Sequence, residues 1–243
     1  MRKLSCLLFF IALFTITGCN QPVKVLLIMG GHAFDTAEFY MTFEAMEQFS
    51  FDPVYYPEAL EKLKTDKPED YDVLVFYDYN PELPMEDSSV FKRLTEKGKP
   101  LLFLHHSICT FQKWKGYGEM VGGKYIIPGF EQDSSLWSTY AHDLDLNVRI
   151  VDPGHPITMG MKDFIIHDEG YANLLIQEDV TPLLASNHPY SSQLLGWTHH
   201  FNRSAVVYLM LGHDKKAYEN PAFPLLVERS ITWLANHENT NPE

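Results

Sequence analysis

Cysteine is scarce in this sequence, which has only Cys6, Cys19 and Cys109 among its 243 residues. Cys6 and Cys19 belong to an N-terminal segment with the features of a signal peptide, so Cys109 is the one cysteine left beyond it. A single cysteine cannot form an internal disulfide bond. The fold must therefore depend on its hydrophobic core, even in an oxidising compartment.

Several catalytic signatures are missing as well. The chain has no Gly-x-Ser-x-Gly elbow, no Walker loop and no dinucleotide fingerprint, which argues against serine hydrolase, nucleotide and NAD chemistry. Basic residues are also few, because 19 Lys and Arg stand against 32 Asp and Glu and give a net charge of −13. An acidic surface disfavours nucleic acid as a partner, since its phosphates select basic patches.

The N-terminus has the pattern of a bacterial lipoprotein signal. Arg2 and Lys3 precede an apolar stretch over residues 4–16, and Thr17, Gly18 and Cys19 follow it. A charged start, an apolar run and small residues at the cleavage point are typical of a secretory signal peptide. A cysteine at that point resembles a lipobox, although an ordinary signal with a chance cysteine is the alternative. The run is shorter than the ~20 apolar residues that span a bilayer.

We therefore predict a lipoprotein signal peptide over residues 1–18, a lipidated linker over residues 19–22 and one domain over residues 23–238. Loss of the signal leaves 225 of the 243 residues and removes two positive charges, which takes the net charge from −13 to −15. This length suits one α/β domain. The predicted location is the cell envelope, with a lipid anchor at Cys19, in the outer membrane or facing the periplasm.

Four apolar runs rich in Val, Leu and Ile lead into charged or imidazole side chains. Such runs are typical of strands that are buried on both faces of a parallel sheet. Ligands bind at the carboxyl ends of strands in open α/β sheets, so these side chains are expected to meet at one site. The runs cover residues 23–29, 72–77, 100–104 and 205–211, and they lead to His32, to Asp78, to His105 and His106, and to His213 and Asp214.

The rest of the chain predicts one layered α/β domain, because strands and helices alternate without an internal repeat or an interdomain linker. Apolar spacing together with start and stop residues predicts helices over residues 36–49, 86–97, 111–121 and 223–236. Further strands are expected over residues 53–56, 144–151, 164–166, 180–185 and 194–197.

An ordered series of short motifs resembles the trehalose-utilization protein ThuA family, over essentially the whole mature chain. The resemblance implies the fold of class I glutamine amidotransferases, which is a flavodoxin-like, mostly parallel sheet with helices on both faces. The motifs are Gly30-Gly31-His32, Leu104-His105-His106-Ser107, Gly122-Gly123-Lys124-Tyr125, His155-Pro156-Ile157, Asp168-Glu169-Gly170-Tyr171, Trp197 with Val207-Tyr208, Leu211-Gly212-His213-Asp214 and Pro221-Ala222-Phe223.

In that fold the amidotransferase nucleophile is a cysteine at the sharp turn after a central strand. The corresponding turn here reads His105-His106-Ser107, and Cys109 lies beyond it. The resemblance therefore implies the fold without glutaminase chemistry. It also implies a carbohydrate substrate, because the family is associated with the breakdown of disaccharides that have first been oxidised to 3-keto sugars.

Glu169, His213 and His105 are the predicted catalytic residues. A carboxylate among aromatic side chains can gain the raised pKa of a general acid or base, so Glu169 or His213 is expected to move a proton. His105 and His142 are expected to bind a ketone oxygen or a metal. His105, His142 and His213 come from separate segments, and together they suit a site for a divalent metal such as zinc, since open zinc sites commonly have three protein ligands.

Five further residues are predicted to bind substrate: His32, Asp78, His106, His142 and Asp214. Neighbouring residues on a strand point to opposite faces, so one of His105 and His106 should face the site while the other packs beneath it. The alternative is that both are hydrogen-bonded core histidines. Asp214 either orients His213 or caps the turn that follows it.

Two functions fit these residues. A ketone at C3 of a sugar acidifies the proton at C2, so a base can remove it and the glycosidic oxygen at C1 can leave by β-elimination, followed by hydration. Isomerisation through the same enediol is a close variant. The family resemblance, taken together with these residues, therefore implies a keto-glycoside lyase, hydrolase or isomerase. The alternative is a non-catalytic carbohydrate-binding lipoprotein that passes sugars to a partner enzyme.

Overall fold

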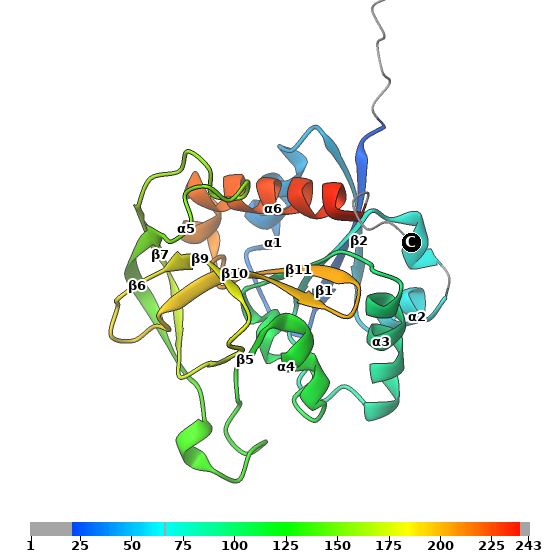
Figure 1. Cartoon of the computed structure of the whole chain (residues 1–243), viewed down its shortest axis with the longest axis horizontal. Helices are drawn as coiled ribbons and strands as arrows, with labels where there is room; N and C mark the ends of the chain where they lie inside the picture. The colour runs from blue at the N-terminus through cyan, green and yellow to red at the C-terminus, as the bar shows by residue number, and fades with distance from the viewer. Residues whose placement is uncertain (1–20, 66, 239–243) are drawn as a thin grey trace, which may run out of the picture.

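A nine-stranded sheet forms the centre of the computed structural model, which describes residues 21–65 and 67–238 (Figure 1). The predicted signal peptide and the predicted lipidated cysteine lie outside these residues. The strand order is β2-β1-β3-β4-β11-β10-β9-β6-β7. These strands are β1 (Val23–Gly30), β2 (Phe49–Tyr55), β3 (Val73–Asp78), β4 (Leu101–Leu104), β6 (Thr139–Ile150), β7 (Phe164–Ala172), β9 (Thr181–Ala185), β10 (Leu194–Phe201) and β11 (Ser204–Leu209).

The first five strands in this order run parallel to one another. Every residue of β3, β4 and β11 is buried, as expected for strands that are covered on both faces. The helices α1 and α6 lie on one side of the sheet, and α3 and α4 lie on the other (Figure 1). The helices are α1 (Thr36–Glu44), α2 (Glu58–Lys64), α3 (Ser88–Glu96), α4 (Lys115–Val121), α5 (Lys215–Tyr218) and α6 (Ala222–Glu238).

The other four strands extend the sheet with antiparallel pairing. Strands β6 and β7 are longer than the sequence predicts, so His142 and Glu169 lie on strands and not on loops. The pairing of β6 with β7 shifts register between Ala141 and Leu144, where Asp143 has a φ of +55°. Such a bulge re-aims the side chains beside it, and here it includes His142.

Two predicted helices are shorter in the structure. The helix expected over residues 111–121 forms only over α4, because Phe111 has a φ of +55°, outside the helical region. Helix α1 ends at Glu44, and Asp35 at its N-cap makes no side-chain hydrogen bond to the first turn. The Asp35 carboxylate instead accepts a hydrogen bond from the backbone N–H of Lys215, 2.8 Å away, which ties α1 to the start of α5.

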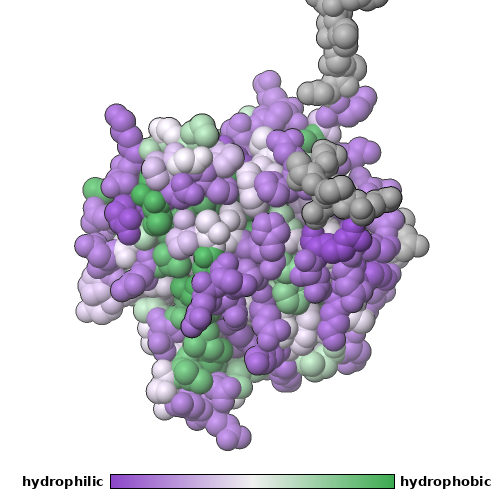
Figure 2. Space-filling model, viewed as in Figure 1, coloured by the Kyte–Doolittle hydropathy of each residue, from purple (hydrophilic) through white to green (hydrophobic). Residues whose placement is uncertain are grey.

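Apolar residues are mostly enclosed by this arrangement. The face in Figure 2 is largely hydrophilic, and its hydrophobic residues gather in a narrow band. Among the described residues, no helix combines the length and the apolarity that crossing a bilayer requires. Outside the main sheet, β5 (Gly123–Lys124) pairs with β8 (Leu175–Ile176) in a small antiparallel ribbon.

Candidate functional site

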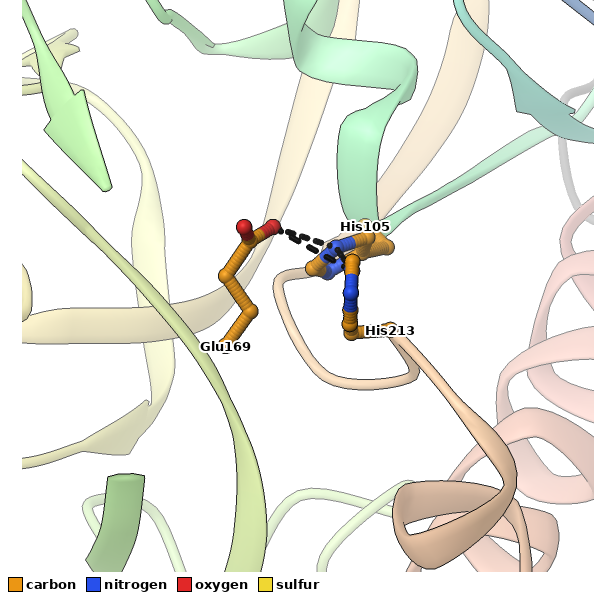
Figure 3. A group of neighbouring side chains, drawn as sticks. All are labelled: His105, Glu169 and His213. Atoms are coloured by element: carbon orange, nitrogen blue, oxygen red, sulfur yellow. Dashed lines mark hydrogen bonds and ion pairs between the residues drawn. The ribbon is translucent and has the colours of Figure 1, made fainter. Parts of the chain in front are cut away.

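Three predicted catalytic side chains meet at the carboxyl end of the parallel strands. Nε2 of His105 lies 3.0 Å from Oε2 of Glu169 and 3.1 Å from Nδ1 of His213. Nδ1 of His213 lies 3.3 Å from the same carboxylate oxygen. Figure 3 shows Glu169 reaching from its strand toward both rings. Segments that are far apart in the sequence therefore form one cluster, as the strand ends predict.

His105 sits at the sharp turn that follows β4, at the start of the 3-10 helix His105–Cys109. Its φ is +47°, an unfavourable backbone conformation for a residue with a Cβ atom. Its side chain is fully buried, and Nδ1 lies 2.6 Å from the carbonyl oxygen of Met210. A carbonyl oxygen only accepts hydrogen bonds, so Nδ1 carries the proton and Nε2 faces Glu169.

Glu169 connects this cluster to a further histidine. While Oε2 faces His105 and His213, Oε1 lies 3.1 Å from Nδ1 of His142. Burial acts to raise the pKa of Glu169, but the hydrogen bonds with His105 and His213 outweigh it and hold the pKa well below its usual range. Burial acts to lower the pKa of His213, and the bond to Glu169 outweighs it and raises that pKa. The carboxylate is thus held in its charged form.

Asp168 holds two members of the cluster in place through their backbones. Its Oδ1 accepts hydrogen bonds from the N–H of Glu169 at 2.8 Å and of His213 at 2.9 Å. Its Oδ2 accepts from the N–H of Gly212 at 2.7 Å. The side chain is buried, and this burial raises the pKa of Asp168 despite these bonds. One carboxylate therefore fixes the loop after β11 against β7.

A cavity of about 300 Å³ opens beside Glu169, a volume at the lower end of the range for small-molecule sites. Tyrosines make up much of its wall, and imidazoles line the part near the cluster. The hydroxyl of Tyr171 lies 2.9 Å from Nε2 of His105, so this tyrosine touches both the cluster and the cavity. The lining residues are His32, Tyr79, His106, Cys109, Tyr125, Ile127, Pro128, Tyr140, His142, Glu169 and Tyr171.

A larger hollow of about 440 Å³ lies along β6 and β7, where Arg149, Asp163 and Asn187 are among its lining residues. None of the clustered histidines lines it. We therefore take the smaller cavity as the candidate site, because histidines and Glu169 line it.

His32 and His106 form a second imidazole pair on the cavity wall. Their ring centroids are 4.9 Å apart, and burial lowers the pKa of both rings, that of His106 well below its usual value. Both ring nitrogens of His106 are buried without a hydrogen-bond partner among the described residues. A buried polar atom normally has a partner, so the two unpaired nitrogens distinguish His106 from the other imidazoles of the site.

The glycine before His32 explains the Gly-Gly-His motif. A Cβ atom on Gly31 would lie 1.8 Å from the carbonyl oxygen of Tyr79, and the φ of Gly31 is +84°. Only glycine fits this close approach of two backbone segments. The motif therefore places His32 beside His106 through backbone geometry.

Two predicted substrate-binding residues lie outside the cavity wall. Asp78 is fully buried, and its Oδ2 accepts hydrogen bonds from Asn80 and Thr110, both 3.1 Å away. Asp214 caps α5, because its carboxylate accepts from the backbone N–H groups of Lys216 and Ala217. Both carboxylates therefore bond to groups outside the cavity. For Asp214, the structure shows the second of the two predicted roles, capping the turn that follows it.

The structure thus gathers most of the predicted site residues and adds others. His105, His213 and Glu169 form the cluster, while His142, His32 and His106 surround it on the cavity wall. Asp168 and the cavity tyrosines are additions that the sequence did not single out as site residues. The Asp168-Glu169-Gly170-Tyr171 motif was a usable signal, because it contains two of the added residues.

The fold and the elbow after β4 define a class, the α/β proteins of the glutamine amidotransferase type. A putative GMP synthase component from Thermoplasma acidophilum has a similar structure, with 10% identity and a TM-score of 0.54 over 90% of this chain and 97% of that chain. At this identity the likeness shows the fold alone. It confirms the predicted fold class.

Within this class, the chain belongs to the ThuA family, whose description is trehalose utilisation and whose model matches residues 24–234. A putative ThuA-like protein from Parabacteroides merdae is 17% identical, with a TM-score of 0.73 over 92% of this chain and 93% of that chain. Another from Bacteroides uniformis is 18% identical, with a TM-score of 0.67 over 88% and 91%. A search of curated proteins finds no match. The family resemblance seen in the sequence is confirmed.

Proposed function

We propose that this protein acts on oxidised, 3-keto glycosides by base-assisted elimination and hydration, or by isomerisation through the same intermediate. The observation that carries the proposal is the juxtaposition of an imidazole–carboxylate cluster with a tyrosine-lined cavity of about 300 Å³. Tyrosine rings offer flat, amphipathic surfaces that suit sugar rings. Membership of a family described by trehalose utilisation supports a carbohydrate substrate.

The chemistry needs a group that removes the C2 proton of the sugar. We assign this role to His142 in place of Glu169 or His213, which the sequence predicts, because the nitrogen and oxygen atoms of those two residues face one another inside the cluster. The His142 side chain lines the cavity and is 53% exposed. Its Nδ1 lies 3.1 Å from Oε1 of Glu169, so the neutral ring directs Nδ1–H to the carboxylate and keeps Nε2 as the base.

The proposed steps balance without an oxidant or a reductant. His142 takes the C2 proton, and the electron pair of that C–H bond forms an enolate with the C3 ketone. The enolate collapses to a C1–C2 double bond as the C1–O bond breaks, and the leaving oxygen takes the proton from His142. Water then adds its hydroxyl to C1 and its hydrogen to C2, which releases a 3-keto sugar. In the isomerisation, the C3 enolate oxygen takes the proton of the C2 hydroxyl, His142 returns its proton to C3, and the ketone is left at C2.

Hydrogen exchange at C2 tests this chemistry directly. Purified protein in D₂O is expected to place deuterium at C2 of a 3-keto-disaccharide, followed by product formation, and to leave the unoxidised disaccharide unchanged. We expect His142→Gln to slow exchange by about 10²–10⁴-fold, the usual contribution of general acid–base catalysis. His200 is exposed on β10 and does not line the cavity, so His200→Gln should keep the wild-type rate.

Absence of both exchange and product with the wild-type protein would refute the proposed reaction. Tight binding of the keto sugar without turnover, measured by calorimetry, would instead support the alternative of a non-catalytic carbohydrate-binding protein. Equal rates for His142→Gln and His200→Gln would remove His142 from the mechanism while leaving the substrate class intact.

We also propose that the protein works in the cell envelope, anchored by a lipid on Cys19. The N-terminal pattern supports this location. The described chain enters β1 at Val23, at the amino ends of the parallel strands and opposite their carboxyl ends. A cavity at those strand ends then faces away from an anchor at the N-terminus. Cys19→Ser is expected to move the full-length protein from the membrane fraction to the soluble fraction, whereas Cys109→Ser should leave it in the membranes.

A further inference from the structure

Three ligand atoms in the cluster lie close enough together to share one ion. They are Nε2 of His105, Nδ1 of His213 and Oε2 of Glu169, with separations of 3.0, 3.1 and 3.3 Å. His105 and Glu169 are buried and His213 is partly buried. In residues 21–65 and 67–238, this is the set of three His, Cys, Asp or Glu side chains whose ligand atoms meet the spacing of a metal site.

The hydrogen bonds around His105 leave a lone pair directed at a carboxylate. Its Nδ1 must carry the proton, because Nδ1 lies 2.6 Å from the Met210 carbonyl oxygen. In the neutral ring Nε2 is then an acceptor, and it lies 3.0 Å from a second acceptor, Oε2 of Glu169. A proton on Nδ1 of His213 and the proton of the Tyr171 hydroxyl can form hydrogen bonds in the cluster. Neither proton lies between Nε2 of His105 and Oε2 of Glu169. A shared proton, as in the hydrogen bond between His105 and Glu169 described above, or a metal cation between the two atoms resolves the repulsion.

The separations match the edges of a metal coordination shell. Zinc binds imidazole nitrogen and carboxylate oxygen at about 2.0–2.2 Å, which puts neighbouring ligands of a tetrahedron roughly 3.3–3.5 Å apart. The observed separations of 3.0–3.3 Å need to widen by only a few tenths of an ångström. Two imidazoles and one carboxylate form a ligand set typical of catalytic zinc, with a fourth position left for water or substrate.

We propose that His105, His213 and Glu169 bind one divalent transition-metal ion, with zinc as the preferred ion. The second contact of His105 supports this assignment, because metal-binding histidines generally donate their other N–H to a carbonyl or a carboxylate. Asp168 provides the same kind of support from the backbone side, since it holds the N–H groups of both Glu169 and His213. When bound, such an ion supplies a Lewis acid for a ketone or hydroxyl oxygen of the substrate.

This ligand set differs from the three histidines that the sequence predicts. His142 contacts Oε1 of Glu169, whereas His105 and His213 both contact Oε2. In our proposal Glu169 takes the third ligand position, and His142 orients that carboxylate from outside. The two sets make opposite predictions for single substitutions, so binding measurements can separate them.

Metal binding tests the proposal without any substrate. The purified wild-type protein is first stripped with a chelator and then titrated with Zn²⁺ in competition with a chromogenic chelator. We expect one Zn²⁺ per chain, and we expect Co²⁺ in the same site to give the intense visible absorption of a four-coordinate ion. Glu169→Gln should weaken Zn²⁺ binding by at least about 10²-fold, because the amide is a poorer ligand and cannot balance the charge of the ion.

His200→Gln is the matched control and should keep the wild-type stoichiometry and affinity, whereas His142→Gln should keep the stoichiometry and weaken binding by about 10–100-fold, the usual effect of losing a residue that orients a metal ligand. Failure of the wild-type protein to bind Zn²⁺ or Co²⁺ would overturn the proposal and leave a proton as the shared cation. Binding that survives in Glu169→Gln but disappears in His142→Gln would also overturn it, in favour of the three-histidine set.

The metal proposal and the proposed reaction can fail separately. A protein that binds Zn²⁺ but does not exchange the C2 proton of keto sugars keeps the metal site and loses the reaction. A protein that exchanges the proton equally well after chelation keeps the reaction and loses a catalytic role for the ion. Circular dichroism of each variant shows whether a change in binding comes from a change in folding.

Discussion

Asp168→Asn should lower the free energy of unfolding by about 3 kcal/mol and disable the cluster. The carboxylate accepts three backbone N–H groups through its two oxygens. An asparagine has only one oxygen, so its NH₂ group must face either Gly212 or both Glu169 and His213. Each buried donor left unpaired costs roughly 1–3 kcal/mol. Urea unfolding at pH 7 measures the change.

The same substitution should weaken metal binding by about 10–100-fold, the usual effect of disturbing residues that support metal ligands. Asp163→Asn is the matched control, because Asp163 is exposed and its Oδ1 accepts a single backbone N–H, from Ile150. An asparagine oxygen can keep that bond, so the control should stay within about 0.5 kcal/mol of the wild type. Equal stability of the two variants would contradict the role assigned to Asp168.

We expect the wild-type protein to lose stability between about pH 4 and pH 7 because Asp78 ionises, and we expect Asp78→Asn to lack this loss. Burial raises the pKa of Asp78 from 3.8 to about 6, against the opposing effect of hydrogen bonds from Asn80 and Thr110. The folded protein therefore favours the protonated carboxyl. The protonated Asp78 carboxyl contributes its full stabilisation below the pKa of 3.8 that it has in the unfolded chain. This stabilisation is lost as the pH rises through the folded-state pKa of about 6.

The full difference is roughly 3 kcal/mol, at about 1.4 kcal/mol for each unit of pKa shift. Asparagine resembles the neutral carboxyl, since its oxygen can still accept from Asn80 and Thr110 while its NH₂ takes the position of Oδ1, which has no hydrogen-bond partner among the described residues. Urea unfolding at intervals from pH 4 to pH 7 should show a smaller decline for the variant. Parallel curves for the two proteins would show that Asp78 is not a source of the decline.

The parallel half of the sheet could be predicted because its strands are continuous apolar runs. His105 and His213 follow β4 and β11, whose burial on both faces made the strand ends readable. The position of His32 was equally predictable, because a Gly-Gly pair after an apolar run marks a tight backbone turn. The rule that parallel strands present ligands at their carboxyl ends then brought these residues together without a structure.

The antiparallel half was less predictable for a physical reason. Strand β7 has buried residues at four consecutive positions from Asp168 to Tyr171, so the alternation that identifies a half-exposed strand is lost. Neighbouring carboxylates at Asp168 and Glu169 look alike in the sequence, although one holds backbone N–H groups and the other faces imidazoles. The bulge at Asp143 also hides the register that turns His142 toward the cavity.

The division of the sheet has a consequence for the order of assembly. His105 and His213 belong to the parallel half and Glu169 to the antiparallel half, and the contacts of the cluster join residues 64 and 108 positions apart. Closing such long loops is slow compared with forming local helices and turns. The cluster can form only after the two halves of the sheet have docked. The time at which the refolding protein binds the ion would therefore report when the last stage of folding occurs. An ion held there would also fasten the halves together, and chelation should make the antiparallel half open first.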